Sequence, residues 1–129
     1  MAQPDETSVW FHGTSLIAGL SLLNGAALRL EVALAQKIDG RPGFYLVNDA
    51  DVAAFFAARR VPGAILRVTI SAAAGAALLA RGGRITGLPQ GAFPVPFPGE
   101  QFFLPPKAFA SFNRSRRLGM IALAPHNFR

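Results

Sequence analysis

Two short strings, Phe11-His12-Gly13-Thr14-Ser15 and Gly43-Phe44-Tyr45-Leu46-Val47, limit the fold of this chain more than any other feature. Each holds bulky, β-prone residues and is followed by apolar residues at helical spacing, so each predicts a β-strand that leads directly into a helix. A third hydrophobic segment begins at Glu100 and predicts another strand over 100–104. Strands separated by short helices in this way favour an α+β fold over a doubly wound α/β fold.

Glycine and proline mark where the other elements end. The first strand is expected over 8–12, and further strands at 64–70 and 118–124. Helices are expected at 15–23 with Thr14 or Ser15 as the cap, at 49–60 with Asn48 or Asp49 as the cap, and at 71–80 and 105–113. The sequence leaves residues 26–42 open between a strand and a helix. Leucines and a valine alternate there as in a strand, whereas the alanine-rich stretches favour a helix. Residues 87–99 hold four prolines and three glycines among thirteen residues, which predicts a loop without regular structure.

The length and composition fit one domain. The chain has 129 residues, 51% of them hydrophobic, so we expect a single domain over 8–129 behind a flexible leader at 1–7. The absence of cysteine excludes disulfides and cysteine-ligated metals, and with two histidines and seven acids no other protein-ligated metal site is expected. No apolar run approaches about 18 residues, and the acidic, polar start is not typical of a signal peptide, so no membrane partner is expected.

The net charge of +6 comes almost wholly from arginine. This balance favours nucleic acid, acidic surfaces or anionic small molecules as partners. The densest basic run, Asn113-Arg114-Ser115-Arg116-Arg117, is interpreted as a turn before the last strand. It is either a solvated face or a contact to a pyrophosphate or a nucleic acid. One hypothesis for the whole chain is therefore a basic RNA-binding module without catalysis.

A histidine, a tyrosine and a glutamate on three separate predicted strands, in that order, resemble the His-Tyr-Glu class of ADP-ribosyltransferases. This class comprises the diphtheria-toxin-like and poly-ADP-ribose-polymerase-like enzymes. The resemblance covers about residues 8–124 and rests on the motifs at His12, Tyr45 and Glu100. It implies a compact ADP-ribosyltransferase-like fold of two small packed antiparallel β-sheets with short flanking helices. The sequence contains no Walker loop, Rossmann glycine fingerprint or nucleophile elbow that would point elsewhere.

The first motif is His12-Gly13-Thr14. By the resemblance, His12 would hydrogen-bond the adenosine-side ribose of NAD, and the backbone of Gly13 would pair with the nicotinamide amide. A glycine suits this second role because no Cβ blocks the close approach of a ligand. Taken alone, the motif also fits a histidine at a strand end that is followed by a glycine turn.

The second and third motifs complete the implied site. Tyr45 would stack on the nicotinamide ring, and Phe56 would complete an aromatic sandwich at a position where this branch usually carries tyrosine. Glu100 would hydrogen-bond the nicotinamide ribose and stabilise the developing cation. Chain order selects Glu100, because Glu6 lies in the leader and Glu31 precedes the tyrosine strand. The plainer readings are a structural tyrosine, a core phenylalanine and a solvated glutamate.

The implied function is that of a bacterial mono-ADP-ribosyltransferase toxin or effector domain with NAD as its substrate. The nicotinamide–ribose bond would break through an oxocarbenium-like transition state, and ADP-ribose would pass to a protein or nucleic acid acceptor. An NAD glycohydrolase that uses the same site with water as acceptor is the alternative enzyme. The resemblance further implies an immunity or antitoxin protein that covers the cleft. It also implies action in the cytoplasm of the producing cell or of a target cell.

Overall fold

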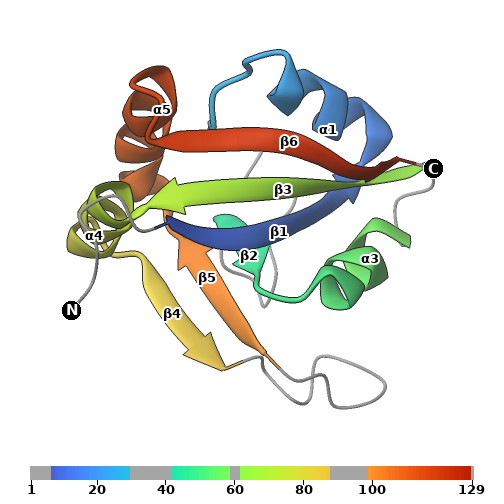
Figure 1. Cartoon of the computed structure of the whole chain (residues 1–129), viewed down its shortest axis with the longest axis horizontal. Coiled ribbons are helices and arrows are strands. Elements are labelled where there is room, and N and C mark those ends of the chain that lie inside the picture. The colour runs from blue at the N-terminus through green and yellow to red at the C-terminus, as the bar shows by residue number, and fades with distance from the viewer. Residues whose placement is uncertain (1–6, 30–41, 59–61, 88–98, 129) are drawn as a thin grey trace.

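The computed structural model describes residues 7–29, 42–58, 62–87 and 99–128. Within them the chain has an α+β fold, with one six-stranded antiparallel sheet and four α-helices around it (Figure 1). The strand order in the sheet is β4-β5-β2-β1-β3-β6. The strands are β1 (Thr7–Ser15), β2 (Phe44–Val47), β3 (Gly63–Ser71), β4 (Arg84–Gly87), β5 (Glu100–Leu104) and β6 (Ile121–Phe128). The helices are α1 (Leu16–Leu23), α3 (Ala50–Ala58), α4 (Ala72–Ala80) and α5 (Phe109–Arg117), with a short 3₁₀ turn η2 (Pro106–Ala108) before α5.

The prediction of two packed sheets is wrong, because β1 pairs with β2 and joins all six strands into one sheet. This junction is narrow. In the described part of the chain, Phe11 opposite Val47 is the one register pair between the two strands, whereas β1 pairs with β3 along its whole length. Two half-sheets, β4-β5-β2 and β1-β3-β6, therefore meet along one rung, and Figure 1 shows their strands running in clearly different directions.

Two of the expected helix starts are confirmed at the level of single hydrogen bonds. Of the candidates Thr14 and Ser15, Ser15 begins α1 by accepting the Ala18 N–H at 3.2 Å, and Ser71 begins α4 by accepting the Ala74 N–H at 3.1 Å. Such caps satisfy backbone donors that have no partner inside the helix. The expected stop after α1 is also confirmed, because Gly25 has a φ of +101°, the left-handed conformation that glycine adopts most readily.

Three boundaries differ from the sequence prediction. Strand β4 was not predicted, because all four of its residues are exposed and the segment has no alternating apolar pattern. Helix α5 continues to Arg117 instead of ending at Asn113, so the basic run is helical and is not a turn. The last strand begins at Ile121 and not at residue 118, since the chain first turns at Gly119, whose φ is +78°.

Other predictions fall on residues outside the described part of the chain. These are most of the leader (1–6), the middle of the ambiguous segment (30–41) and most of the proline-rich segment (88–98). Thr7, which the leader was expected to include, is the first residue of β1 and pairs with Ser71.

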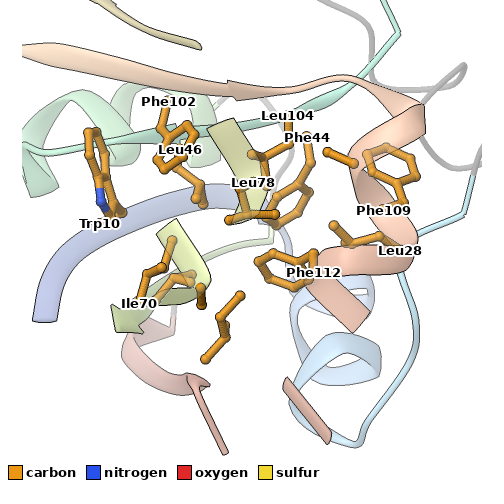
Figure 2. Packing of buried hydrophobic residues seen from close by; sticks show 14 residues of the cluster. Trp10, Leu28, Phe44, Leu46, Ile70, Leu78, Phe102, Leu104, Phe109 and Phe112 are labelled. Atoms are coloured by element: carbon orange, nitrogen blue, oxygen red, sulfur yellow. The ribbon is translucent and has the colours of Figure 1, made fainter. Parts of the chain in front are cut away.

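The sheet buries apolar side chains on both faces. The main core lies on the face covered by α4 and α5, and Figure 2 shows its large side chains, among them Trp10, Phe44, Leu46, Phe102 and Phe112. A smaller cluster lies on the opposite face under α3 and consists of Val47, Val52, Ala53, Ala57 and Ile65. We call these the main-core face and the α3 face. Because side chains alternate along a strand, neighbouring residues of β1, β2 and β5 point to different faces.

Candidate functional site

The three strands that carry the predicted site residues are neighbours in the sheet. His12 lies on β1, Tyr45 on β2 and Glu100 at the start of β5, and these strands are consecutive in the order β5-β2-β1. The pairs Phe11↔Val47 and Val47↔Gln101 form a row across all three strands. His12 and Glu100 flank this row at its two ends, so at least two strand spacings, roughly 10 Å, separate their backbones. That span is of the size of a nucleotide ligand.

The backbone hydrogen bonds of β1 and β2 show which neighbouring strand each residue faces near the end of the β1–β2 ladder. Leu16 N–H donates to the Pro62 carbonyl at 2.8 Å and Asn48 N–H to the Glu100 carbonyl at 3.1 Å. Because backbone groups of an antiparallel strand point alternately to its two neighbours, Gly13 faces β2 and Tyr45 faces β1. A continued ladder would pair Gly13 with Tyr45, yet the ladder ends at the rung before them.

His12 takes the place of the next ladder bond. Its Nδ1 lies 2.8 Å from the Tyr45 carbonyl oxygen, and since a carbonyl oxygen only accepts, Nδ1 carries the proton in this bond. The ring is buried and stacks on Phe44, with centroids 4.1 Å apart and planes 29° apart. The imidazole thus acts as a strut between β1 and β2. The backbone edge of Gly13 points to the side where the rungs have ended.

Tyr45 and His12 leave the sheet on opposite faces. Phe11 and Val47 pair on the α3 face, so alternation puts Tyr45 on that face and His12 on the main-core face with Phe44. The Tyr45 ring packs against Phe103, with centroids 5.0 Å apart. The sequence predicted that the phenol and the imidazole share one groove. The structure brings their strands together and connects them through the Tyr45 carbonyl, but it does not bring the two rings onto one face.

Gly13 is required by the packing of α3. A Cβ at this position would overlap the Ala53 carbonyl oxygen and lie 2.9 Å from its carbonyl carbon and 3.0 Å from the Ala57 nitrogen. These are backbone atoms, which a rotamer change cannot move away. From the sequence we expected this glycine to allow the close approach of a ligand. In the structure, helix α3 fills the space that a Cβ of residue 13 would occupy.

Glu100 is exposed at the start of β5. Its neighbour Gln101 pairs with Val47 of the α3 face, so alternation puts the Glu100 side chain on the main-core side with His12 and on the opposite face from Tyr45. Its backbone is held by one residue. Its N–H donates to Asn48 Oδ1 at 2.7 Å, and its carbonyl accepts the Asn48 N–H at 3.1 Å. Asn48 and Asp49 were the two candidates to begin the next helix, and Asp49 does so by accepting the Asp51 N–H at 2.8 Å. Phe56 lies on that helix, α3, and its side chain is outside the described part of the structure.

A cavity of about 90 Å³ opens on the main-core face beside the first motif. Its apolar lining includes Phe44 and Phe109, and Arg29 stands among its lining residues with an exposed side chain. Thr14 also lines it. The Thr14 hydroxyl is buried, with 1% of the residue exposed, and has no hydrogen-bond partner among the described residues. A buried hydroxyl without a partner is costly, so this oxygen is suited to meet a ligand in the cavity.

Helix α5 holds one wall of this cavity. Asn113 accepts the Leu28 N–H at 2.8 Å and donates to the Leu28 carbonyl at 3.1 Å, as a strand partner would. Arg116 donates to the Ala26 carbonyl at 3.3 Å and also to that of Leu22. Burial lowers the pKa of the Arg116 guanidinium. The basic run is therefore divided: Asn113 and Arg116 fix the cavity wall, and only its other two arginines are exposed.

Sequence reasoning missed Asn48, Asn113 and Arg116. A polar residue after a strand is an ordinary helix start, and arginines before a strand are an ordinary solvated face. The partners of these side chains lie between 52 and 94 residues away along the chain, so no local pattern reports them.

Compared with protein-family models, with curated proteins and with solved structures, the chain matches none. No helix in the described ranges is long and apolar enough to cross a membrane. Within the same ranges, no three histidine or acidic side chains gather as they would around a metal ion.

Proposed function

We propose that the chain is a mono-ADP-ribosyltransferase that cleaves NAD at the nicotinamide–ribose bond and transfers ADP-ribose to a macromolecular acceptor. The observation that carries this proposal is the end of the β1–β2 ladder. There His12 donates to the Tyr45 carbonyl, and in the described part of the chain Gly13, whose peptide groups face β2, has no register pair with Tyr45. Peptide groups at the end of a ladder can pair with a planar amide, as a further strand would. Nicotinamide carries such an amide.

The nicotinamide ring is assigned to the α3 face. Tyr45 and the Gly13 position share this face with α3, the helix that also bears Phe56. Tyr45 is buried against Phe103, with 8% of the residue exposed, so the ring would offer its flat, negatively polarised surface to the positively charged pyridinium where this packing opens. In this proposal the Gly13 backbone fixes the amide, and Tyr45 supplies the stacking surface.

The adenosine end is assigned to the cavity on the main-core face. Its apolar walls suit a nucleobase, the Thr14 hydroxyl suits a ribose hydroxyl, and Arg29 suits a phosphate. Thr14 and Phe44 adjoin Gly13 and Tyr45 along their strands but point to the opposite face. A dinucleotide bound at both places would therefore pass between β1 and β2 where their ladder has ended. The net charge of +6 favours the approach of the anionic substrate.

Glu100 is assigned the catalytic carboxylate. The bond between the ribose C1′ and the nicotinamide nitrogen breaks, and its electron pair leaves with the nicotinamide, which becomes neutral. The positive charge that develops on the ribose is stabilised by the carboxylate. The acceptor nucleophile then bonds to C1′ and releases its proton to solvent. The acceptor class, an immunity or antitoxin protein over the site, and action in a bacterial or target-cell cytoplasm belong to this proposal.

The test is NAD turnover by the purified chain, followed as nicotinamide release. We expect turnover by the wild type and a fall of about 100-fold or more in Glu100→Gln, because the amide removes the charge that stabilises the cation. Glu31→Gln is the matched control, since it makes the same chemical change at a glutamate the mechanism does not use.

The acceptor is tested by adding a cell lysate and NAD labelled in the adenosine part. Label that protease removes identifies a protein acceptor, and label that nuclease removes identifies a nucleic acid. Nicotinamide release without labelled macromolecules would replace transfer by hydrolysis. No nicotinamide release under any of these conditions would refute the proposed enzyme.

A further inference from the structure

Asn48 holds both backbone polar groups of Glu100. Its side-chain Oδ1 accepts the Glu100 N–H at 2.7 Å, and its own N–H donates to the Glu100 carbonyl at 3.1 Å. In a regular ladder the N–H of Glu100 would bond to the carbonyl of residue 48. Here the side-chain amide takes over that bond at the point where the chain leaves β2 for α3.

Gly99, the residue before Glu100, leaves the space that the contact between Asn48 and Glu100 needs. Gly99 has a φ of +120°, a conformation that residues with a side chain rarely adopt. A Cβ at Gly99 would also lie 2.6 Å from Asn48 Oδ1. Any other residue at this position would therefore be strained and would displace the oxygen that holds Glu100.

Glu100 depends on this backbone anchor because it has little else to fix its position. It is the first residue of β5 and its side chain is exposed, so no packing restrains it. Its opposite neighbour on β4, Gly87, has no side chain. Asn48 is not needed to begin α3, since Asp49 does that.

We propose that Asn48 is the positioning residue of the Glu100 carboxylate, a role that rests on the proposed function. It fixes the start of β5 relative to the end of β2 and so holds the Glu100 backbone, from which the carboxylate extends, beside the strand that carries Tyr45. A displacement of a catalytic group by about 1 Å can cost about 100-fold in rate.

The test compares Asn48→Ala, Asn48→Asp and Ser71→Ala in steady-state NAD cleavage. Asn48→Ala removes the acceptor oxygen, and we expect kcat to fall about 10- to 100-fold while KM for NAD stays within about 3-fold. Asn48→Asp keeps an oxygen at the same place and should restore kcat to within about 5-fold of the wild type. Ser71→Ala deletes the side-chain bond that begins α4, far along the chain from this contact, and controls for a general loss of stability.

A second measurement separates this inference from the proposed function. Hydrogen exchange of the Glu100 amide should be slow in the wild type and in Asn48→Asp, and at least about 10-fold faster in Asn48→Ala. If the wild type has no NAD turnover, the proposed function fails, while the exchange result still decides whether Asn48 anchors Glu100. The inference is overturned if Asn48→Ala keeps the wild-type kcat, or if its Glu100 amide exchanges as slowly as in the wild type.

Discussion

The packing of α3 on β1 makes Gly13→Ala a strongly destabilising substitution. The added methyl group would overlap the Ala53 carbonyl oxygen and lie 2.9 Å from its carbonyl carbon, whereas carbon atoms in contact prefer about 3.5–4.0 Å. The helix backbone must therefore move by roughly 0.6–1 Å or more, and this would disturb the small cluster between α3 and the sheet. Overpacking of this kind costs about 1–3 kcal/mol, and contact with backbone atoms favours the upper half of that range.

Thermal and urea unfolding measure this cost. A loss of about 2–3 kcal/mol in the free energy of unfolding corresponds to a fall of roughly 6–15 °C in Tm for a domain of this size. Gly63→Ala should behave alike, because its Cβ would overlap the Ala57 carbonyl of the same helix.

Gly75→Ala is the matched control for Gly13→Ala. It lies inside α4, where the new Cβ would meet one Ile70 methyl group at 3.8 Å, an ordinary contact. Alanine is favoured over glycine in a helix, so this variant should gain about 0.5–1 kcal/mol. A Gly13→Ala protein that is as stable as the wild type, or that gains stability as Gly75→Ala does, would show that α3 does not rest on β1 at this point.

Two further predictions concern the cavity. Thr14→Val replaces the buried hydroxyl by a methyl group of similar size and should raise the free energy of unfolding by about 1 kcal/mol in urea titrations. The same variant should raise KM for NAD about 5- to 10-fold if that hydroxyl binds the ribose, and an unchanged KM would remove Thr14 from the site. Arg116→Met deletes the bonds to the Leu22 and Ala26 carbonyls and should cost about 1.5–3 kcal/mol, whereas exposed Arg117→Met should stay within about 0.5 kcal/mol. Equal stabilities of the two variants would show that the bonds from Arg116 to the Leu22 and Ala26 carbonyls do not stabilise the fold.

The sequence predicted the elements whose signals are local. The strands at His12, Tyr45 and Glu100 follow from runs of bulky residues, and the start of α1 follows from the serine at Ser15. Strand β4 was missed because it is short and wholly exposed. The end of α5 was missed because its last turn is polar and basic and has no apolar pattern to indicate a helix.

The candidate site was less predictable than the fold, because its contacts are not local. Nothing in the residues around His12 indicates that the ring will bond a carbonyl 33 residues away and thereby end a ladder. The face to which a side chain points depends on which strands pair and in which register. Neither motif alone could therefore indicate that the His12 and Tyr45 side chains lie on opposite faces of the sheet. Asn48 and Asn113 hold partners 52 and 85 residues away, and only the fold reveals them.

The single rung between the half-sheets has a consequence for how the chain can be divided. β1, β3 and β6 belong to one half-sheet and β2, β4 and β5 to the other, so the polypeptide passes repeatedly from one half to the other, with α3 linking β2 to β3, α4 linking β3 to β4 and α5 linking β5 to β6. No single cut can release either half as a continuous fragment. Although few bonds join them across the sheet, the halves are interlaced by the chain itself, and each must complete its folding together with the other.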